Sequence, residues 1–200
     1  IDRITNGDPE GIYANTDWFK LLFKPFAPTY NNSVSLSGGS EDFKYYVMAG
    51  AYNQEGIIDR TSYDRYNVRA NIDAKIIDNL SVKVGFAYSN STQLEPGLSA
   101  GKGNTWASIL SQAVMMYPYL PTEYDGLPVG SLNGAGNGNQ NPLTARDKSG
   151  TSMNKRNTTN LNAALKYDFP FVKGLSFKLN ATYEQTDSFS KISQLSYNLK

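Results

Sequence analysis

The sequence offers few residues that could carry out covalent chemistry. Among its 200 residues there is no His and no Cys. This excludes from the chain the usual general base, a nucleophilic thiol and the common histidine- or thiolate-ligated metal sites. Asp and Asn occur in the long polar stretches, but their spacing does not match an EF-hand loop. We therefore expect no enzymatic activity, no cofactor and no metal site.

The side chains best suited to bind a ligand are aromatic and lie in one long stretch rich in Gly, Asn, Ser and Pro. They are Trp106, Tyr117, Tyr119 and Tyr124. Aromatic rings stack on sugar faces and on peptides, and they also pack on partner proteins or within their own loop. These four residues are the candidate sites for a ligand or a protein partner. The glycine-rich residues 134–138 lack the strand and Lys of a phosphate loop, so they indicate a flexible connection.

Two further groups of residues have regular spacing. One has roughly helical spacing and predicts a short helix: Trp18, Phe19, Leu22 and Phe23. It could contact a partner protein or pack on the structure beside it. The other is a charged row on one face of a strand: Arg65, Arg69, Asp73 and Lys75. Such a row could select solutes or brace the wall through charge-assisted hydrogen bonds.

The charged row belongs to the clearest strand of the sequence. Residues 65–76 alternate between apolar and polar side chains without interruption. This period of two is typical of a strand with one apolar and one polar face. Strands of soluble proteins average about 5–6 residues, whereas a tilted strand that crosses a bilayer needs about 9–11. The length therefore favours a membrane-spanning strand.

Similar alternation recurs along the chain and predicts six strands. They lie near residues 30–38, 43–53, 65–76, 80–89, 160–169 and 175–184. Their connections are alternately short and long, as in outer-membrane barrels with tight periplasmic turns and long extracellular loops. This predicts four regions: an extracellular rim segment with a short helix (1–28), four barrel strands (29–90), a long extracellular loop (91–157), and two strands with the start of the next loop (158–200).

The aromatic residues of these strands are sorted by position. One set lies near the extracellular ends: Tyr66, Phe86, Tyr88 and Tyr183. The other lies near the periplasmic ends: Phe43, Tyr45, Tyr167 and Phe169. Mostly aliphatic residues lie between them, and we expect Ala70, Ile72, Val82 and Val84 to face lipid near the middle of the bilayer. Periodicity alone would also fit a soluble antiparallel sandwich or adhesin module, in which the apolar rows face a core.

Composition narrows the class further. The net charge of +1 argues against a basic nucleic-acid-binding module. The sequence has no run of about 18 apolar residues that would predict a membrane helix. The chain begins with Ile1, without an initiator Met or a signal-peptide profile. We interpret it as part of a longer protein.

Several sequence phrases resemble the SusC/RagA family of TonB-dependent outer-membrane transporters. The strongest part covers residues 16–73: Thr16-Asp17-Trp18, then Ser33 to Glu41, Tyr45-Tyr46, Asn53 to Ile58, and Arg65 to Asp73. In the long loop, Tyr117-Pro118, Tyr124-Asp125-Gly126 and Asn141-Pro142-Leu143 also fit. The resemblance covers nearly the whole chain.

This resemblance implies an all-β fold, in which the chain is an antiparallel fragment of a transmembrane barrel of 22 strands. It implies TonB-dependent import of oligosaccharides or oligopeptides across the bacterial outer membrane. The implied partners are a SusD-like surface lipoprotein, outer-membrane lipid, the cargo, and the TonB complex, which would act through parts absent from this chain. The alternative is a β-rich surface adhesin or binding protein that transports nothing.

Overall fold

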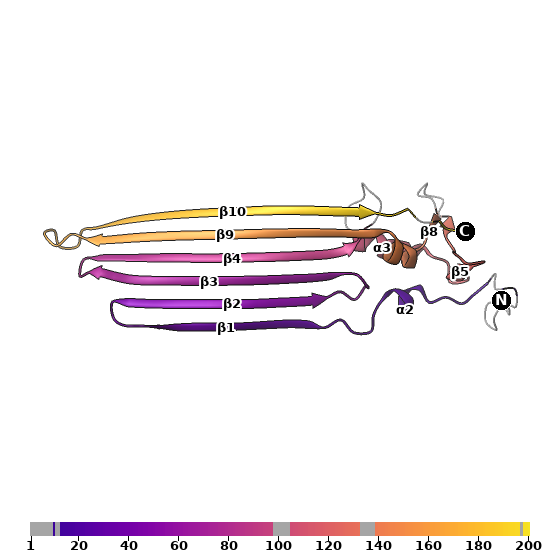
Figure 1. Ribbon diagram of the computed structural model, residues 1–200, viewed down its shortest axis with the longest axis horizontal. Helices are drawn as coiled ribbons and strands as arrows, with labels where there is room; N and C mark the ends of the chain where they lie inside the picture. The colour runs from indigo at the N-terminus through magenta and orange to yellow at the C-terminus, as the bar shows by residue number, and fades with distance from the viewer. Residues whose placement is uncertain (1–9, 11–12, 98–104, 133–138, 197) are drawn as a thin grey trace.

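The computed structural model describes residue 10 and residues 13–97, 105–132, 139–196 and 198–200. Its main element is a single antiparallel sheet of six strands in the order β1-β2-β3-β4-β9-β10. The bounds are Thr29–Gly39 (β1), Phe43–Glu55 (β2), Ser62–Ile77 (β3), Leu80–Pro96 (β4), Gly150–Asp168 (β9) and Ser176–Gln194 (β10). The strands lie side by side, with three hairpin turns at one end and the helices at the other (Figure 1). We call these the turn end and the loop end. The predicted six-stranded antiparallel sheet is confirmed.

The strand pairing puts the apolar positions of all six strands on one face of the sheet. For example, Val47 pairs with Ala70, and Ala70 pairs with Phe86 on the next strand. Large apolar side chains of this face are exposed, including Val34, Val47 and Ile72. Among the described residues, the buried hydrophobic side chains lie outside the six strands, apart from Pro96 at the last position of β4. In the part of the chain that the structure describes, the six strands form one sheet whose apolar face is exposed, which differs from the two packed sheets of a sandwich.

The apolar belt on this face is inclined to the strands. Four tyrosines mark its edge toward the loop end: Tyr30, Tyr66, Tyr88 and Tyr183. We traced the strand pairing from each tyrosine to β2. In the same order, the four tyrosines lie level with Asn53, Ala51, Ala49 and Val47. From β1 to β10, which are five strand-to-strand steps apart, the edge therefore shifts by six residues toward the turn end. With about 3.4 Å per residue and about 4.8 Å between strands, the inclination is about 40°, which matches the strand tilt of membrane barrels.

Three strands extend further toward the loop end than the alternation predicted. β4 and β9 remain paired as far as Pro96 and Thr151, and β10 continues to Gln194. The added residues are mostly polar on both faces, so they carry no period-two signal. Backbone pairing and side-chain bonds still order them, such as that from Asn90 Nδ2 to Asn157 Oδ1, 2.5 Å. The connection between these two strands therefore lies between Pro96 and Gly150, within the stretch 91–157 that we expect to be extracellular.

Among the described residues, the loop end contains three helices and two small hairpins. The helices are α2 (Trp18–Leu22), α3 (Thr105–Met115) and α4 (Pro142–Lys148). Two-residue strands form the hairpins: β5 (Glu123–Tyr124) with β6 (Leu127–Pro128), and β7 (Ser131–Leu132) with β8 (Asn139–Gln140). In the described part of the chain, no helix has the length and apolar character required to cross a membrane. The glycine-rich stretch 134–138 lies outside the described residues.

Local capping explains where α2 and α4 begin. The side chain of Asp17 accepts a hydrogen bond from Lys20 N, 3.0 Å, at the start of α2. The Asn141 side chain accepts from the amides of Leu143 and Thr144 at the start of α4, both 3.0 Å. These bonds satisfy amides that the first helical turn leaves free. Pro142 then occupies the first helical position, where its missing N–H costs nothing.

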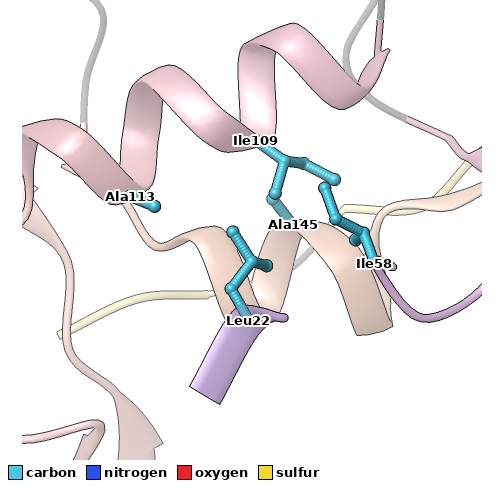
Figure 2. Close-up of a cluster of buried hydrophobic side chains, with 5 residues drawn as sticks. All are labelled: Leu22, Ile58, Ile109, Ala113 and Ala145. Carbon is cyan, nitrogen blue, oxygen red and sulfur yellow. The ribbon is translucent and has the colours of Figure 1, made fainter. Parts of the chain in front are cut away.

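The hydrophobic core lies at the loop end and joins the helices to the sheet. Figure 2 shows its five side chains pointing toward one another: Leu22, Ile58, Ile109, Ala113 and Ala145. They come from α2, α3, α4 and the β2–β3 connection. Because these segments are far apart in sequence, only the assembled fold can bury them together. We call this assembly the loop-end block.

A glycine at the start of β9 permits the tight backbone packing beneath this block. Gly150 has φ +102°, and a Cβ there would overlap the carbonyl oxygen of Ser193 on β10. We expect Gly150→Ala to lower the free energy of unfolding of the full-length protein by about 1–3 kcal/mol. Thermal unfolding followed by gel mobility would measure it.

Gly126 provides the matched control for this change. It also has positive φ, +73°, but a Cβ there would meet no atom. Gly126→Ala should therefore show the backbone strain without the overlap, and its effect should be the smaller of the two. Equal effects would contradict the role given to the contact with Ser193.

Candidate functional site

Two of the predicted aromatic residues form an exposed stack at the loop end. The rings of Tyr117 and Tyr119 have centroids 5.2 Å apart and an interplanar angle of 14°. Their exposed fractions are 47% and 39%. Tyr13 extends the group, with its ring 6.5 Å from that of Tyr119 and tilted by 56°. Sequence reasoning missed Tyr13, because it lies far from Tyr117 and Tyr119 along the chain. We call these three residues the tyrosine platform.

Hydrogen bonds from the N-terminal segment fix the backbone of the platform. Ala14 N donates to Tyr119 O, 2.9 Å, and Thr16 N donates to Pro118 O, 2.7 Å. The Thr16 hydroxyl donates to Leu120 O, 2.6 Å. This pairing resembles a short β-bridge and orders the chain beneath the rings of Tyr117 and Tyr119, which remain exposed. An ordered aromatic surface binds at a smaller entropic cost than a mobile one.

Trp18 supports the platform from below and does not reach the surface. Its side chain is buried, and its indole N–H donates to Tyr117 O, 3.1 Å. A buried indole usually finds such a hydrogen-bond acceptor. Of the two interpretations of the Trp18–Phe23 helix, packing on neighbouring structure therefore describes Trp18 and Leu22. Phe19 remains exposed and stacks on Phe23, with ring centroids 5.9 Å apart.

Of the other two predicted aromatic residues, Tyr124 makes its ring contact elsewhere, with Lys200. Tyr124 lies in the β5–β6 hairpin, where Lys200 Nζ is 4.7 Å from its ring centroid. Lys200 Nζ also forms an ion pair of 2.6 Å with Asp125, and this bond lowers the pKa of the Asp125 carboxyl. One face of Tyr124 is thus used within the protein. Trp106 falls in the first turn of α3, and its side chain lies outside the described part of the structure.

A cavity of about 500 Å³ opens between the loop-end block and the sheet. Its apolar lining residues include Phe23, Ile57, Ile58, Leu94 and Leu110. Its polar ones include Gln54, Tyr63 and Gln93, which lie on the polar face and pair in register across three strands. An apolar cavity with a few convergent polar groups is the usual form of a ligand site. Sequence reasoning missed it, because its walls come from four separate segments.

Two arginines fasten the loop-end block to the strands. Arg60, at φ 64°, donates to the carbonyl oxygens of Arg146 and Asp147 at the end of α4, and to Gly150 O, 3.0 Å. Arg146 donates to Leu21 O, 3.1 Å. Its two bonds to Asp147, both 2.8 Å, raise the pKa of the Arg146 guanidinium. A cation suits the C-terminal end of a helix, where carbonyl groups are unpaired.

The charged row of β3 divides into two parts. Asp73 pairs with Lys83 on β4, 2.8 Å, and Lys75 pairs with Asp78, 2.7 Å. Arg65 instead lies over the ring of Tyr52, 5.6 Å from its centroid. Among the described residues, Arg69 has neither an ion pair nor a hydrogen-bond partner. The half of the row near the turn end therefore braces the wall, whereas the half near the loop end is available to other groups.

Comparison with known proteins gives consistent results from sequence and structure. The chain is 38% identical over 107 residues to TonB-dependent receptor P26 of Formosa agariphila, which covers 54% of this chain and 10% of that protein. It is 25% identical over 166 residues to TonB-dependent receptor P3 of the same bacterium, which covers 82% of this chain and 16% of that protein. The chain therefore spans less than a fifth of the length of these relatives. No family model matches it.

Two solved structures share the fold. One is the RagAB peptide importer in the closed-closed state, with a TM-score of 0.61 and 25% identity. The other is the RagAB peptide transporter, with a TM-score of 0.62 and 26% identity. Each match covers 87% of this chain and 19% of the chain it matches. The six strands therefore correspond to part of a transmembrane barrel wall, in which β1 and β10 are the two open edges of the fragment.

Proposed function

We propose that this chain, a segment of a SusC/RagA-type TonB-dependent transporter barrel in the bacterial outer membrane, takes part in the import of oligosaccharides or oligopeptides. The full protein would draw its energy through TonB and work with a SusD-like surface lipoprotein. The matched relatives are receptors and transporters, which are not enzymes. This agrees with a chain that has no His or Cys.

The observation that carries the proposal is the exposed tyrosine platform held on a rigid loop-end block. An import channel must first bind its cargo at the outer surface, either directly or through a lipoprotein that holds the cargo. Stacked, half-exposed tyrosines suit both sugar rings and peptides, because they combine an apolar face with a hydroxyl group. The name of the RagAB peptide importer supports a peptide cargo by analogy.

The proposal requires that the loop end faces the cell exterior. We expect a Cys introduced at Ser111, which is exposed on α3, to react with an impermeant thiol reagent on intact cells. A Cys at Glu41, in the β1–β2 turn, should react only after the outer membrane is permeabilised. The chain has no Cys of its own, so it adds no background. The opposite labelling pattern would invert the topology.

Substitutions in the platform test the function directly. We expect Tyr117→Ala and Tyr119→Ala to weaken uptake or lipoprotein binding by about two- to tenfold, because aromatic stacking contributes about 0.5–1.5 kcal/mol per pair. Outer-membrane abundance should be unchanged, since both rings are exposed. Uptake is measured with labelled oligosaccharide and oligopeptide mixtures, supplied separately, in cells with and without functional TonB.

Tyr117→Phe and Tyr124→Ala serve as controls for these substitutions. Tyr117→Phe keeps the stacking ring, and Tyr124 already lies against Lys200. Both variants should retain more uptake than Tyr117→Ala. Binding of a mixture without TonB-dependent uptake would favour the alternative, a surface-binding protein. Normal uptake by both platform variants would remove the platform from the import route.

A further inference from the structure

The turn between β9 and β10 differs in chemistry from the other two turns of the sheet. The β1–β2 turn consists of Ser40, Glu41 and Asp42, and the β3–β4 turn of Asp78 and Asn79. Residues 169–175 are instead mostly apolar, with the sequence Phe-Pro-Phe-Val-Lys-Gly-Leu. This turn also projects beyond the other two in Figure 1. We call it the apolar turn.

Internal hydrogen bonds order the apolar turn. Phe169 N donates to Leu175 O, 3.0 Å, and Leu175 N donates to Val172 O, 3.1 Å. Phe171 nevertheless has an exposed fraction of 77%, the highest among the exposed large hydrophobic side chains of the described residues. An ordered turn that exposes a large apolar ring marks a surface for contact with another apolar phase or molecule.

The aromatic rings of the turn continue the apolar face of the sheet. Tyr167 lies on that face, paired with Phe177. The rings of Tyr167 and Phe169 have centroids 5.0 Å apart, and those of Phe169 and Phe171 are 5.5 Å apart. Phe171 is therefore the last member of a row of three rings that begins within the belt.

The inclination of the belt gives the depth of this row. Phe43 marks the belt edge on β2 toward the turn end, and through the pairing it lies level with Leu165 on β9. Because the belt is inclined by about 40°, its edge shifts by about four residues toward the turn end between β2 and β9. The same depth on β9 is therefore reached at Phe169. Phe171 lies two residues further on in the turn, with its ring centroid 5.5 Å from that of Phe169.

We propose that the apolar turn is a membrane-interface anchor that binds the phospholipid surface at the turn end. Phe169 and Phe171 lie at the boundary between acyl chains and headgroups, the depth that aromatic side chains prefer. Lys173 is exposed in the same turn and lies where its ammonium group can reach lipid phosphates. Phospholipid is the partner because the row of rings continues the lipid-facing belt. The turn then fixes the depth of this side of the wall.

The inference places this turn, one of the tight turns expected on the periplasmic side, at the lipid interface. It rests on the membrane-barrel fold and not on the proposed import. A protein that imports cargo while Phe171 lies in water would overturn the anchor alone. A protein with Phe171 in lipid that imports nothing would leave the anchor standing and overturn the import.

Fluorescence in vesicles tests the anchor. The full-length protein carrying Phe171→Trp is reconstituted in phosphatidylcholine vesicles, with and without brominated acyl chains, and the wild-type signal is subtracted. Glu41→Trp, in the polar β1–β2 turn, is the matched control. We expect brominated lipid to reduce the added fluorescence at position 171 by about twofold or more relative to position 41, because quenching requires close approach to the acyl region. Aqueous iodide should show the reverse preference.

Strong iodide quenching at position 171, equal to that at position 41, would overturn the anchor by placing the turn in water. Quenching by neither reagent would also overturn it, because the ring would then be covered by protein. If Phe171→Trp does not fold, Lys173→Cys with a nitroxide label gives a second measurement. Its collisions with oxygen and with a soluble nickel chelate should then place it at the headgroup level, and a fully aqueous ratio would reject the anchor.

Discussion

Replacing Val84 with Arg should lower the free energy of unfolding of the full-length barrel by about 2–4 kcal/mol, the cost of a lipid-facing Arg at the middle of a bilayer. Val84 lies on the exposed apolar face, between Ile72 and Ala163 of the adjacent strands. On β4 it is midway between Leu80 and Tyr88, so the inclined belt puts it near its centre. Val82, also expected near mid-bilayer, lies closer to the turn end and should cost less.

Unfolding in lipid vesicles by urea, followed by Trp fluorescence, would measure this difference. Ser89→Arg is the matched control, because Ser89 lies on the polar face of the same strand, beside Asn67 and Thr158. It adds the same charge to the opposite side of the wall. A loss at Ser89 as large as that at Val84 would mean that the apolar face is not the lipid face.

Replacing Leu22 with Ala should destabilise the loop-end block by about 2–5 kcal/mol, the range for Leu removed from a well-packed core. Leu22 is 0% exposed and is packed with Ile58, Ile109 and Ala145. The segments around it are tied by hydrogen bonds and cannot all move inward to fill the space. Because the six strands are held by their own ladder, we expect the loss to stay local.

Hydrogen exchange would detect it as faster exchange of amides in α3 and α4, while the sheet amides keep their protection. Leu21→Ala is the matched control, since the same atoms are removed from the adjacent residue, whose side chain is 46% exposed. Its effect should be small. If exchange rises throughout the sheet in Leu22→Ala, the block and the wall form one cooperative unit.

Most of the wall could be predicted from sequence, for a reason visible in single strands. Residues 65–76 alternate because one face meets an apolar phase and the other does not, so the signal is local. The same logic fails beyond the belt, where β4 and β9 continue with polar residues on both faces. There the two strands are held by backbone pairing with each other. A run of polar residues in the sequence does not indicate which strand it pairs with.

The loop-end block was largely hidden from sequence reasoning. The composition around 97–149 suggests an irregular loop, yet α3 and α4 form there. Nothing in the local sequence marks Ile109 and Ala145 as core residues. They are buried because Leu22 and Ile58, from two other segments, pack against them. The site followed the same rule. Tyr117 and Tyr119 are near neighbours in sequence and their rings stack, whereas Tyr13, which lies beside Tyr119, is distant in sequence and was not among the predicted residues. The ring of Tyr124 lies against Lys200 instead.

The long-range bonds of the block have a consequence for the order of assembly. Arg146 donates to Leu21 across 125 residues, and Thr16 donates to Leu120 across 104. Such contacts cannot form early, because closing long loops costs entropy that only later contacts repay. The hairpins β1–β2 and β3–β4 close short loops and should form first. Until β9 docks on β4, α4 has no fixed position and the tyrosine platform has no complete support. The loop-end block would therefore form last. The tyrosine platform would then become able to bind a ligand only after the strands of the sheet have paired.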